Sequence, residues 1–239
     1  MWRGQVKALL GLGGLVWLAS CAPATMSPMV MRLGPGNPER SFFQAGLRGG
    51  PRLSAPFENS VDPANFAGNE TSFSTQQWSL AYDVAFTEPI NERLFLHMGV
   101  QGEFFYPLPL PGYGLYTGLS TYVGNPRWGL SPALVLRGAT DFGLSSRGGP
   151  GSLLGAESSM ALSLTPEPGV ALGVVPFLGI HRVFSEGARA TALYYGAALA
   201  VQFPLGPRGR LELSGGFGRA KTGSSSTWNA PIAGARWGL

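Results

Sequence analysis

The sequence of 239 residues predicts an all-β fold, and three observations lead to it. Apolar side chains alternate with small or polar ones over ten stretches, which is the period of a strand with one apolar face. Most stretches are about ten residues long, the length that a tilted strand needs to cross a bilayer, whereas soluble strands average about five or six. Charged residues make up only 13% of the chain, about half the usual globular fraction. We therefore expect an antiparallel, up-and-down transmembrane β-barrel of about ten strands, with eight as the alternative.

The clearest pattern is a hairpin near the middle of the N-terminal half. In residues 78–86 every even position is large and apolar, and every odd position is small or polar. A short polar connection follows, and the alternation returns in residues 94–104, where His97, Gln101 and Glu103 lie on the polar face. In a barrel wall the apolar face meets lipid and the polar face meets the interior.

Eight further stretches repeat this alternation between segments rich in Gly, Pro, Asn or Ser. In chain order they are 41–54, 113–123, 130–142, 154–164, 170–180, 193–203, 211–217 and 228–239. In residues 130–142 apolar side chains occupy both parities, so the facing of that strand is left open. Neighbouring strands with short connections predict antiparallel hairpins. Closure is expected because an open edge in lipid leaves backbone groups unpaired, at several kcal/mol each.

The N-terminus predicts an exported protein. Two basic residues precede an apolar run at residues 8–18, which is too short for a spanning helix of about twenty residues and is typical of a secretory signal. The run ends in Leu18-Ala19-Ser20-Cys21, which resembles the lipobox of bacterial lipoproteins. This resemblance implies that Cys21 becomes the lipidated first residue of the mature chain. The alternative is a plain signal peptide cleaved near Ala22, with an incidental cysteine.

These features divide the chain into three parts. Residues 1–20 form the lipoprotein signal peptide, residues 21–40 a flexible tether after the lipidated cysteine, and residues 41–239 the barrel. The tether is expected because its Pro-, Met- and Gly-rich sequence has no period. From residue 21 onward 15 basic residues stand against 13 acidic ones, with no block of like charge. A nucleic-acid partner is therefore not expected.

Over residues 41–239 the pattern resembles small bacterial outer-membrane β-barrel proteins of the porin and OmpA type. The resemblance implies that short turns face the periplasm and long loops face outside. An even number of strands then places both termini in the periplasm, where a lipidated Cys21 would anchor the chain. The implied partners are outer-membrane lipids, the barrel-assembly and lipoprotein-sorting machinery, and a cell-envelope protein at the loops.

If the polar parity faces inward, the lumen collects charges of both signs. A barrel of eight to ten strands is narrow enough for side chains to fill it, and buried charges must be paired. We therefore expect a network of ion pairs and hydrogen bonds that plugs the lumen. Its expected members are Arg48, Arg52, Asp83, His97, Gln101, Glu103, Arg137, Glu157, His181, Glu212 and Arg236.

Catalysis is not expected from the sequence. Hydrolytic barrels need a serine activated by a histidine, and His97 has no serine two or four residues away, although His181 has Ser185 four residues on. Two histidines without a paired cysteine do not predict a metal site, and no cofactor is expected. The predicted function is a non-enzymatic outer-membrane lipoprotein with a structural or interaction role through its extracellular loops. The alternatives are a narrow porin-like channel for small solutes and a soluble periplasmic β-sandwich lipoprotein.

Overall fold

The computed structural model describes residues 33–34, 42–54, 74–104, 112–140, 152–185, 188–206, 209–222 and 226–238. Ten long strands and one short strand account for nearly all of them. The strands are β1 (Phe42–Ser54), β2 (Ser74–Pro89), β3 (Leu94–Phe104), β4 (Gly112–Thr121), β5 (Val123–Gly124), β6 (Trp128–Thr140), β7 (Ser152–Glu167), β8 (Val170–Ser185), β9 (Ala188–Leu205), β10 (Gly209–Thr222) and β11 (Ser226–Gly238).

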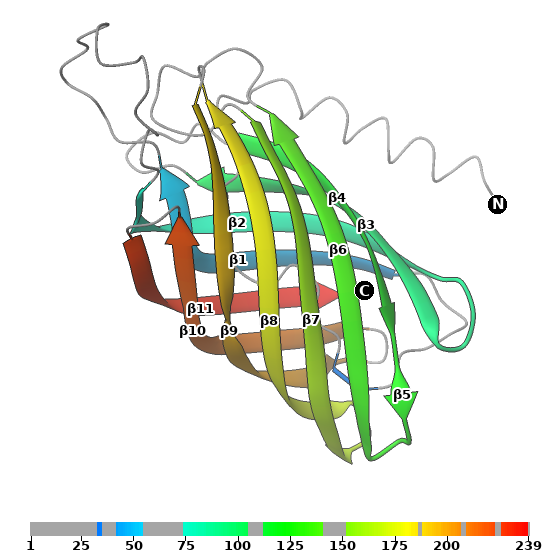
Figure 1. Cartoon of the computed structure of the whole chain (residues 1–239). Coiled ribbons are helices and arrows are strands. Elements are labelled where there is room, and N and C mark those ends of the chain that lie inside the picture. The colour runs from blue at the N-terminus through cyan, green and yellow to red at the C-terminus, as the bar shows by residue number, and fades with distance from the viewer. Residues whose placement is uncertain are drawn as a thin grey trace, which may run out of the picture.

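Each strand pairs antiparallel with the next, and the sheet closes on itself (Figure 1). The first strand, β1, pairs with the last, β11, so that Gln44 lies opposite Gly238. The short β5 continues β4 along the same partner, because Ser120 pairs with Ala133 and Val123 with Leu130 on β6. The wall therefore has ten strands. The prediction of a closed antiparallel barrel of about ten strands is confirmed, and the alternatives of eight strands and of a two-sheet sandwich are wrong.

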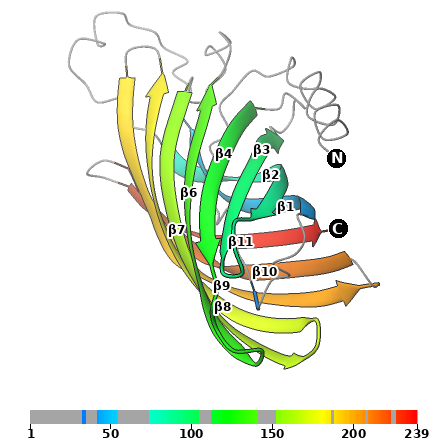
Figure 2. The ribbon, with the colours of Figure 1, turned by 90° about the vertical axis from the view of Figure 1, so that its right-hand side faces the viewer.

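The two ends of the barrel differ. We call the end with connections 90–93, 125–127 and 168–169 the turn end, and the opposite end the loop end. The barrel strands begin and finish at the turn end, where Phe42 and Gly238 lie. A second view shows the long β7, β8 and β9 curving around the barrel toward this end (Figure 2).

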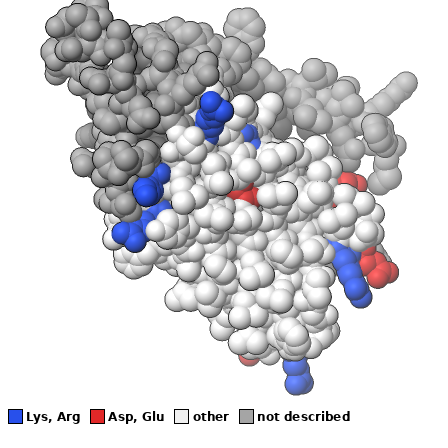
Figure 3. All heavy atoms as spheres, viewed as in Figure 1, with Lys and Arg blue, Asp and Glu red and all other residues white. Residues whose placement is uncertain are grey.

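The outer surface of the wall is apolar. Leu115, Leu199 and Phe217 are 66%, 67% and 71% exposed, and many other large apolar side chains share this face. The face in Figure 3 carries few charged side chains over its broad middle. Soluble monomers rarely expose apolar patches beyond a few hundred Å², whereas a barrel in lipid requires such a band. The outer face therefore fits a bilayer. No described helix has the length and apolarity to cross one.

Aromatic side chains mark the turn end of this band. Phe43, Trp128, Phe203 and Trp237 are all exposed there. Aromatic rings concentrate at both membrane interfaces of such barrels because they are apolar in body and polar at the edge. The turn end therefore has the side chains of a membrane–water boundary.

The structure also settles the facing of the strand whose phase the sequence left open. On β6 Leu134 and Leu136 are each 55% exposed, whereas Val135 and Arg137 are buried. The odd positions of β6 thus face the lumen. Cys21 and the expected signal peptide lie outside the described residues. Of the expected tether only Leu33 and Gly34 are described, and Leu33 is buried.

Candidate functional site

The lumen is the candidate functional site, because the polar side chains of the wall converge in it. Ten of the eleven side chains that the sequence placed in the network are buried, each 6% exposed or less. They come from nearly every part of the wall: Arg48, Asp83, His97, Gln101, Glu103, Arg137, Glu157, His181, Glu212 and Arg236. Arg52 belongs to β1 and lies opposite Gln77 on β2, but its side chain is outside the described part.

The first centre of the network is Asp83 on β2. Its Oδ1 accepts a hydrogen bond from Nε of Arg48 at 3.0 Å, and its Oδ2 accepts one from the Tyr116 hydroxyl at 3.2 Å. Nη2 of Arg236 lies 3.7 Å from the same Oδ2. One carboxylate therefore faces two guanidinium groups from β1 and β11. In an ion pair this deeply buried, the loss of either partner would leave an uncompensated charge and destabilise the fold, so both side chains are needed in this arrangement.

A glycine allows Arg236 to reach Asp83. Both residues lie beside Gly46 in the ladder, one on each side of β1. A Cβ at Gly46 would come within 2.9 Å of Oδ1 of Asp83 and 3.5 Å of Nε of Arg236. Arg236 and Asp83 thus meet across β1, in space that a side chain at position 46 would fill.

Neighbouring polar groups extend this centre around the wall. Nη2 of Arg48 donates to Oε1 of Gln101 at 3.2 Å, and the Ser79 hydroxyl donates to Oε1 of Glu103 at 2.6 Å. Glu212 lies opposite Arg236 in the β10–β11 ladder. Negative and positive side chains therefore alternate across β2, β11 and β10, which lets each charge be balanced by a neighbour.

The second centre is Glu157 on β7. Its Oε1 is 3.1 Å from Nη1 of Arg137 and 3.0 Å from Nε2 of His181, which come from the strands on either side. The ring of Tyr194 on β9 packs against the imidazole with a centroid distance of 5.0 Å. Gly155 lies between Arg137 and His181 in the ladder, and a Cβ there would collide with the imidazole. The same device of a glycine between long side chains therefore serves both centres.

A third group contains an arrangement that spacing along one strand did not predict. Nε2 of His97 lies 2.6 Å from the Ser120 hydroxyl, and its Nδ1 lies 2.9 Å from the Thr87 hydroxyl. Ser120 belongs to β4, His97 to β3 and Thr87 to β2. The order of hydroxyl, imidazole and second hydroxyl matches a nucleophile, a base and an orienting group in outline.

Burial argues against chemistry at this trio. Ser120 is 2% exposed, His97 4% and Thr87 0%, so a substrate has no direct path to the Ser120 hydroxyl. The orienting group is also a neutral hydroxyl, which does not stabilise an imidazolium as a carboxylate does. The arrangement works as a buried hydrogen-bond relay that ties three strands together near the turn end.

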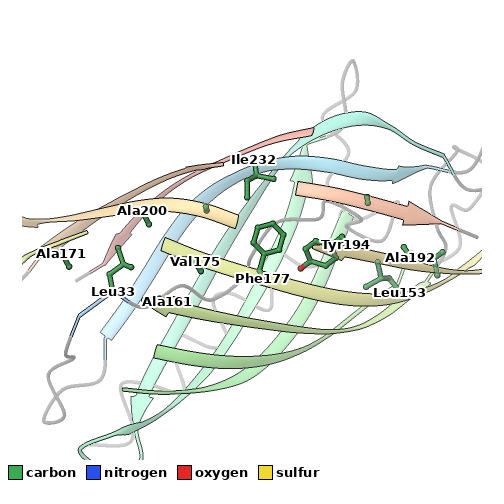
Figure 4. Close-up of a cluster of buried hydrophobic side chains, with 13 residues drawn as sticks. Leu33, Leu153, Ala161, Ala171, Val175, Phe177, Ala192, Tyr194, Ala200 and Ile232 are labelled. Carbon is green, nitrogen blue, oxygen red and sulfur yellow. The ribbon is translucent and has the colours of Figure 1, made fainter. Parts of the chain in front are cut away.

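Apart from His181 and Glu212, the inner faces of β8, β9 and β10 are mainly apolar. On the inner faces of β8, β9 and β10 small and aromatic side chains form one buried cluster (Figure 4). Its members from these strands are Ala171, Val175, Phe177, Val183, Ala192, Tyr194, Ala198, Ala200 and Ala220. The described residues contain no group of three or more His, Cys, Asp or Glu side chains arranged to hold a metal ion.

Comparison with known proteins adds no activity to this geometry. No family model matches the chain, and no curated protein matches it. A solved outer membrane channel from Pseudomonas putida F1 is 9% identical, with a TM-score of 0.45 over 89% of this chain and 98% of the other. The outer membrane protease OmpT from Escherichia coli is 10% identical, with a TM-score of 0.34 over 89% and 97%. The chain itself forms a closed, antiparallel, ten-stranded barrel.

Proposed function

We propose that the protein is a lipid-anchored outer-membrane barrel without enzymatic activity, closed through its lumen by its own side chains. Its role is structural or one of interaction, exercised through the loops at the loop end. Both termini lie on the periplasmic side, where Cys21 carries the anchor. The barrel-assembly and lipoprotein-sorting machinery and a cell-envelope protein are its expected partners.

The observation that carries this proposal is the pairing of charges across the lumen. Asp83 and Glu157 each contact two basic side chains from neighbouring parts of the wall. All of these side chains are nearly inaccessible to water. A conducting pore keeps its polar lining wet, whereas this lining is paired with itself.

Planar-bilayer recording tests closure directly. Purified, refolded protein is expected to give no steady current above the lipid background, because the paired side chains leave no continuous water path. Unboiled gel migration serves as the control that the protein added is folded. Reproducible unitary currents from protein that passes this control would contradict the proposal.

The anchor is tested by replacing Cys21 with serine. The expected result is loss of metabolically incorporated palmitate while the barrel stays in the membrane fraction, because the apolar wall holds it there without the lipid. Retention of the label in Cys21→Ser would show that the anchor is elsewhere. Release of the variant into the soluble fraction would contradict the membrane-spanning assignment.

The absence of catalysis is tested with a fluorophosphonate probe, which labels activated serines covalently. We expect no labelling of folded protein, because Ser120 is buried. Labelling that disappears in Ser120→Ala and in His97→Ala, while both variants still migrate as folded barrels, would make the trio an active site.

A narrow channel is the second candidate, and three polar atoms favour it. Nε2 of Gln101, Oε2 of Glu157 and Nδ1 of His181 are buried without a hydrogen-bond partner among the described residues. Such atoms ordinarily bind ordered water, so a file of water along the network would satisfy them. Under this alternative the bilayer recordings show small currents, and truncation of Arg48 to alanine increases them.

A further inference from the structure

A residue that precedes the barrel in sequence lies inside it. Leu33 is nine positions before Phe42, is 1% exposed, and belongs to the buried cluster of the apolar wall. Figure 4 shows its side chain beside the inner face of the sheet near Ala171 and Ala161. Neither Leu33 nor Gly34 belongs to a strand. The Leu33 side chain therefore occupies space in the lumen without belonging to a strand of the wall.

The seat of Leu33 is a hollow made by small residues. Ala161, Ala171 and Ala200 line this part of the wall, together with Gly173. A Cβ at Gly173 would lie 2.5 Å from Cδ2 of Leu33. The strands themselves provide nothing to fill this space. One aliphatic group from elsewhere completes the packing, and proteins do not leave such hollows empty without cost.

Two hydroxyls stand at the edge of this seat. The Ser163 hydroxyl accepts a hydrogen bond from the Gly34 amide at 3.2 Å. Oγ1 of Thr165 is buried with no hydrogen-bond partner among the described residues, and it lies 3.4 Å from where a Cβ of Gly34 would be. Both residues are on β7 near the turn end. An unpaired buried hydroxyl beside an apolar hollow is the lining expected of a site for a chain with an oxygen-bearing head.

Next to the seat of Leu33, the inner face of β8 from Ala171 to Phe177 forms an apolar strip. Inward from the seat, β8 presents Val175 and then Phe177, both buried. No charged side chain interrupts the inner face of β8 between Ala171 and Phe177. This part of β8 is therefore apolar, with the Ser163 and Thr165 hydroxyls at its turn-end mouth and Ser159 of β7 paired with Phe177 at its inner end.

We propose that this seat is a binding site for an unbranched aliphatic chain with a carboxyl or hydroxyl head, the chemistry of a fatty acid, and that Leu33 and Gly34 occupy it in competition with that ligand. The Thr165 hydroxyl donates to the head, and the chain lies along the strip toward Phe177. Leu33 and Gly34 thus act as a latch that leaves when the ligand enters. This inference concerns binding at the turn end and does not depend on whether the lumen conducts.

Crosslinking shows whether the latch and the ligand exclude each other. A Cβ at Gly34 would lie 3.6 Å from Cβ of Ala171, within the range of disulfides. Gly34→Cys and Ala171→Cys are combined in full-length protein that carries Cys21→Ser, so that no other cysteine is present. Binding of the fluorescent fatty acid cis-parinaric acid is then titrated before and after oxidation. We expect the oxidised protein to bind at least about tenfold more weakly than the same protein reduced.

A cysteine at Gly34 is strained, because the φ of this residue is positive, 71°. Two substitutions at other positions therefore test the site independently of the disulfide. Leu33→Ala removes the competing side chain and is expected to tighten probe binding about tenfold, the effect of one buried leucine. Gly173→Leu fills the seat and is expected to abolish it. Leu115→Ala, on the lipid face, is the matched control and leaves binding unchanged.

Each outcome bears on the proposal. Equal probe binding before and after complete oxidation contradicts the competition between latch and ligand. Equal probe binding in wild type, Leu33→Ala and Gly173→Leu, with all three migrating as folded barrels, overturns the ligand site. A change in Leu115→Ala as large as that in Leu33→Ala would mean that the probe binds the outer wall.

Discussion

On their lumen side, β1–β4 are mainly polar and β8–β10, apart from His181 and Glu212, are mainly apolar, at similar burial. The first wall carries Arg48, Asp83, Gln101 and Glu103, whose positions are set by hydrogen bonds of defined length. The second carries alanines, Val175 and Phe177, whose positions are set by contact alone. A buried charge depends on one particular partner, whereas an apolar side chain accepts any neighbour of suitable shape.

This difference predicts that the two walls respond differently to substitution. The polar wall tolerates few substitutions, because removal of one charged side chain leaves its partner's charge uncompensated. The apolar wall tolerates exchange of one aliphatic group for another, which is what a site shared by a latch and a ligand requires. Four substitutions, each with a comparison variant, test the contrast, and all are measured as the free energy of unfolding in urea from lipid vesicles.

The largest effect is expected at Asp83. Asp83→Asn keeps the shape of the side chain but leaves Arg48 and Arg236 without their counter-charge, which should destabilise the barrel by about 3–5 kcal/mol. Glu167→Gln, an exposed residue at the turn end, should stay within about 0.5 kcal/mol of wild type. If the two variants unfold alike, the charge pairing of the polar wall contributes nothing.

A hydroxyl deletion sharpens the comparison. Tyr116→Phe removes the hydrogen bond to Asp83 and should cost about 1.5–3 kcal/mol, as for a bond to a charged group. Tyr195→Phe makes the same chemical change on the outer face and should shift stability by less than about 0.5 kcal/mol. Equal losses would show that the Tyr116 hydroxyl is not specifically bonded.

A methyl group inserted into the second network centre is expected to have a somewhat smaller effect. Gly155→Ala places a Cβ against the His181 imidazole and should cost about 1–3 kcal/mol through overpacking. Gly215→Ala provides the matched control, because its Cβ would meet nothing within 4 Å. That control should be neutral or stabilising by up to about 1 kcal/mol. The reverse order would mean that the centre relaxes freely.

The smallest effect is expected on the apolar wall. Phe177→Leu exchanges one apolar side chain for another and should cost about 1 kcal/mol, since neighbouring side chains can repack. Phe177→Asn places an unpaired amide in the same position and should cost at least about 1 kcal/mol more. A loss in Phe177→Leu as large as that in Asp83→Asn would remove the distinction between the two walls.

Much of the fold could be predicted from the sequence, because strand alternation is a local property. The parity of residues 78–86 alone shows which side chains share a face. That parity placed Asp83, and the parity of residues 154–164 placed Glu157, on the face that turns inward. Alternation fails where both parities are apolar, as in residues 130–142, and there only the packed sheet decides.

Contacts across strands could not be read from spacing along one strand. His97 meets Ser120 and Thr87 because the ladder brings three strands into register, and register depends on the whole sheet. The glycines on the polar parity, such as Gly46 and Gly155, were the available signal for close approach of long side chains. Leu33 was hidden for another reason, since a segment without period gives no sign that one of its residues is buried.

The pairing of β1 with β11 has a consequence for how the cylinder closes. Six residue pairs join these strands, from Gln44–Gly238 to Gly49–Ala233, against thirteen between β10 and β11. Among the described residues, the pairing of the first strand with the last is thus about half as long as that of β10 with β11, and it forms only after the last strand has been made. Arg236 reaches Asp83 over this seam, so closing the cylinder brings a second guanidinium to the acid that Arg48 already pairs within the β1–β2 hairpin.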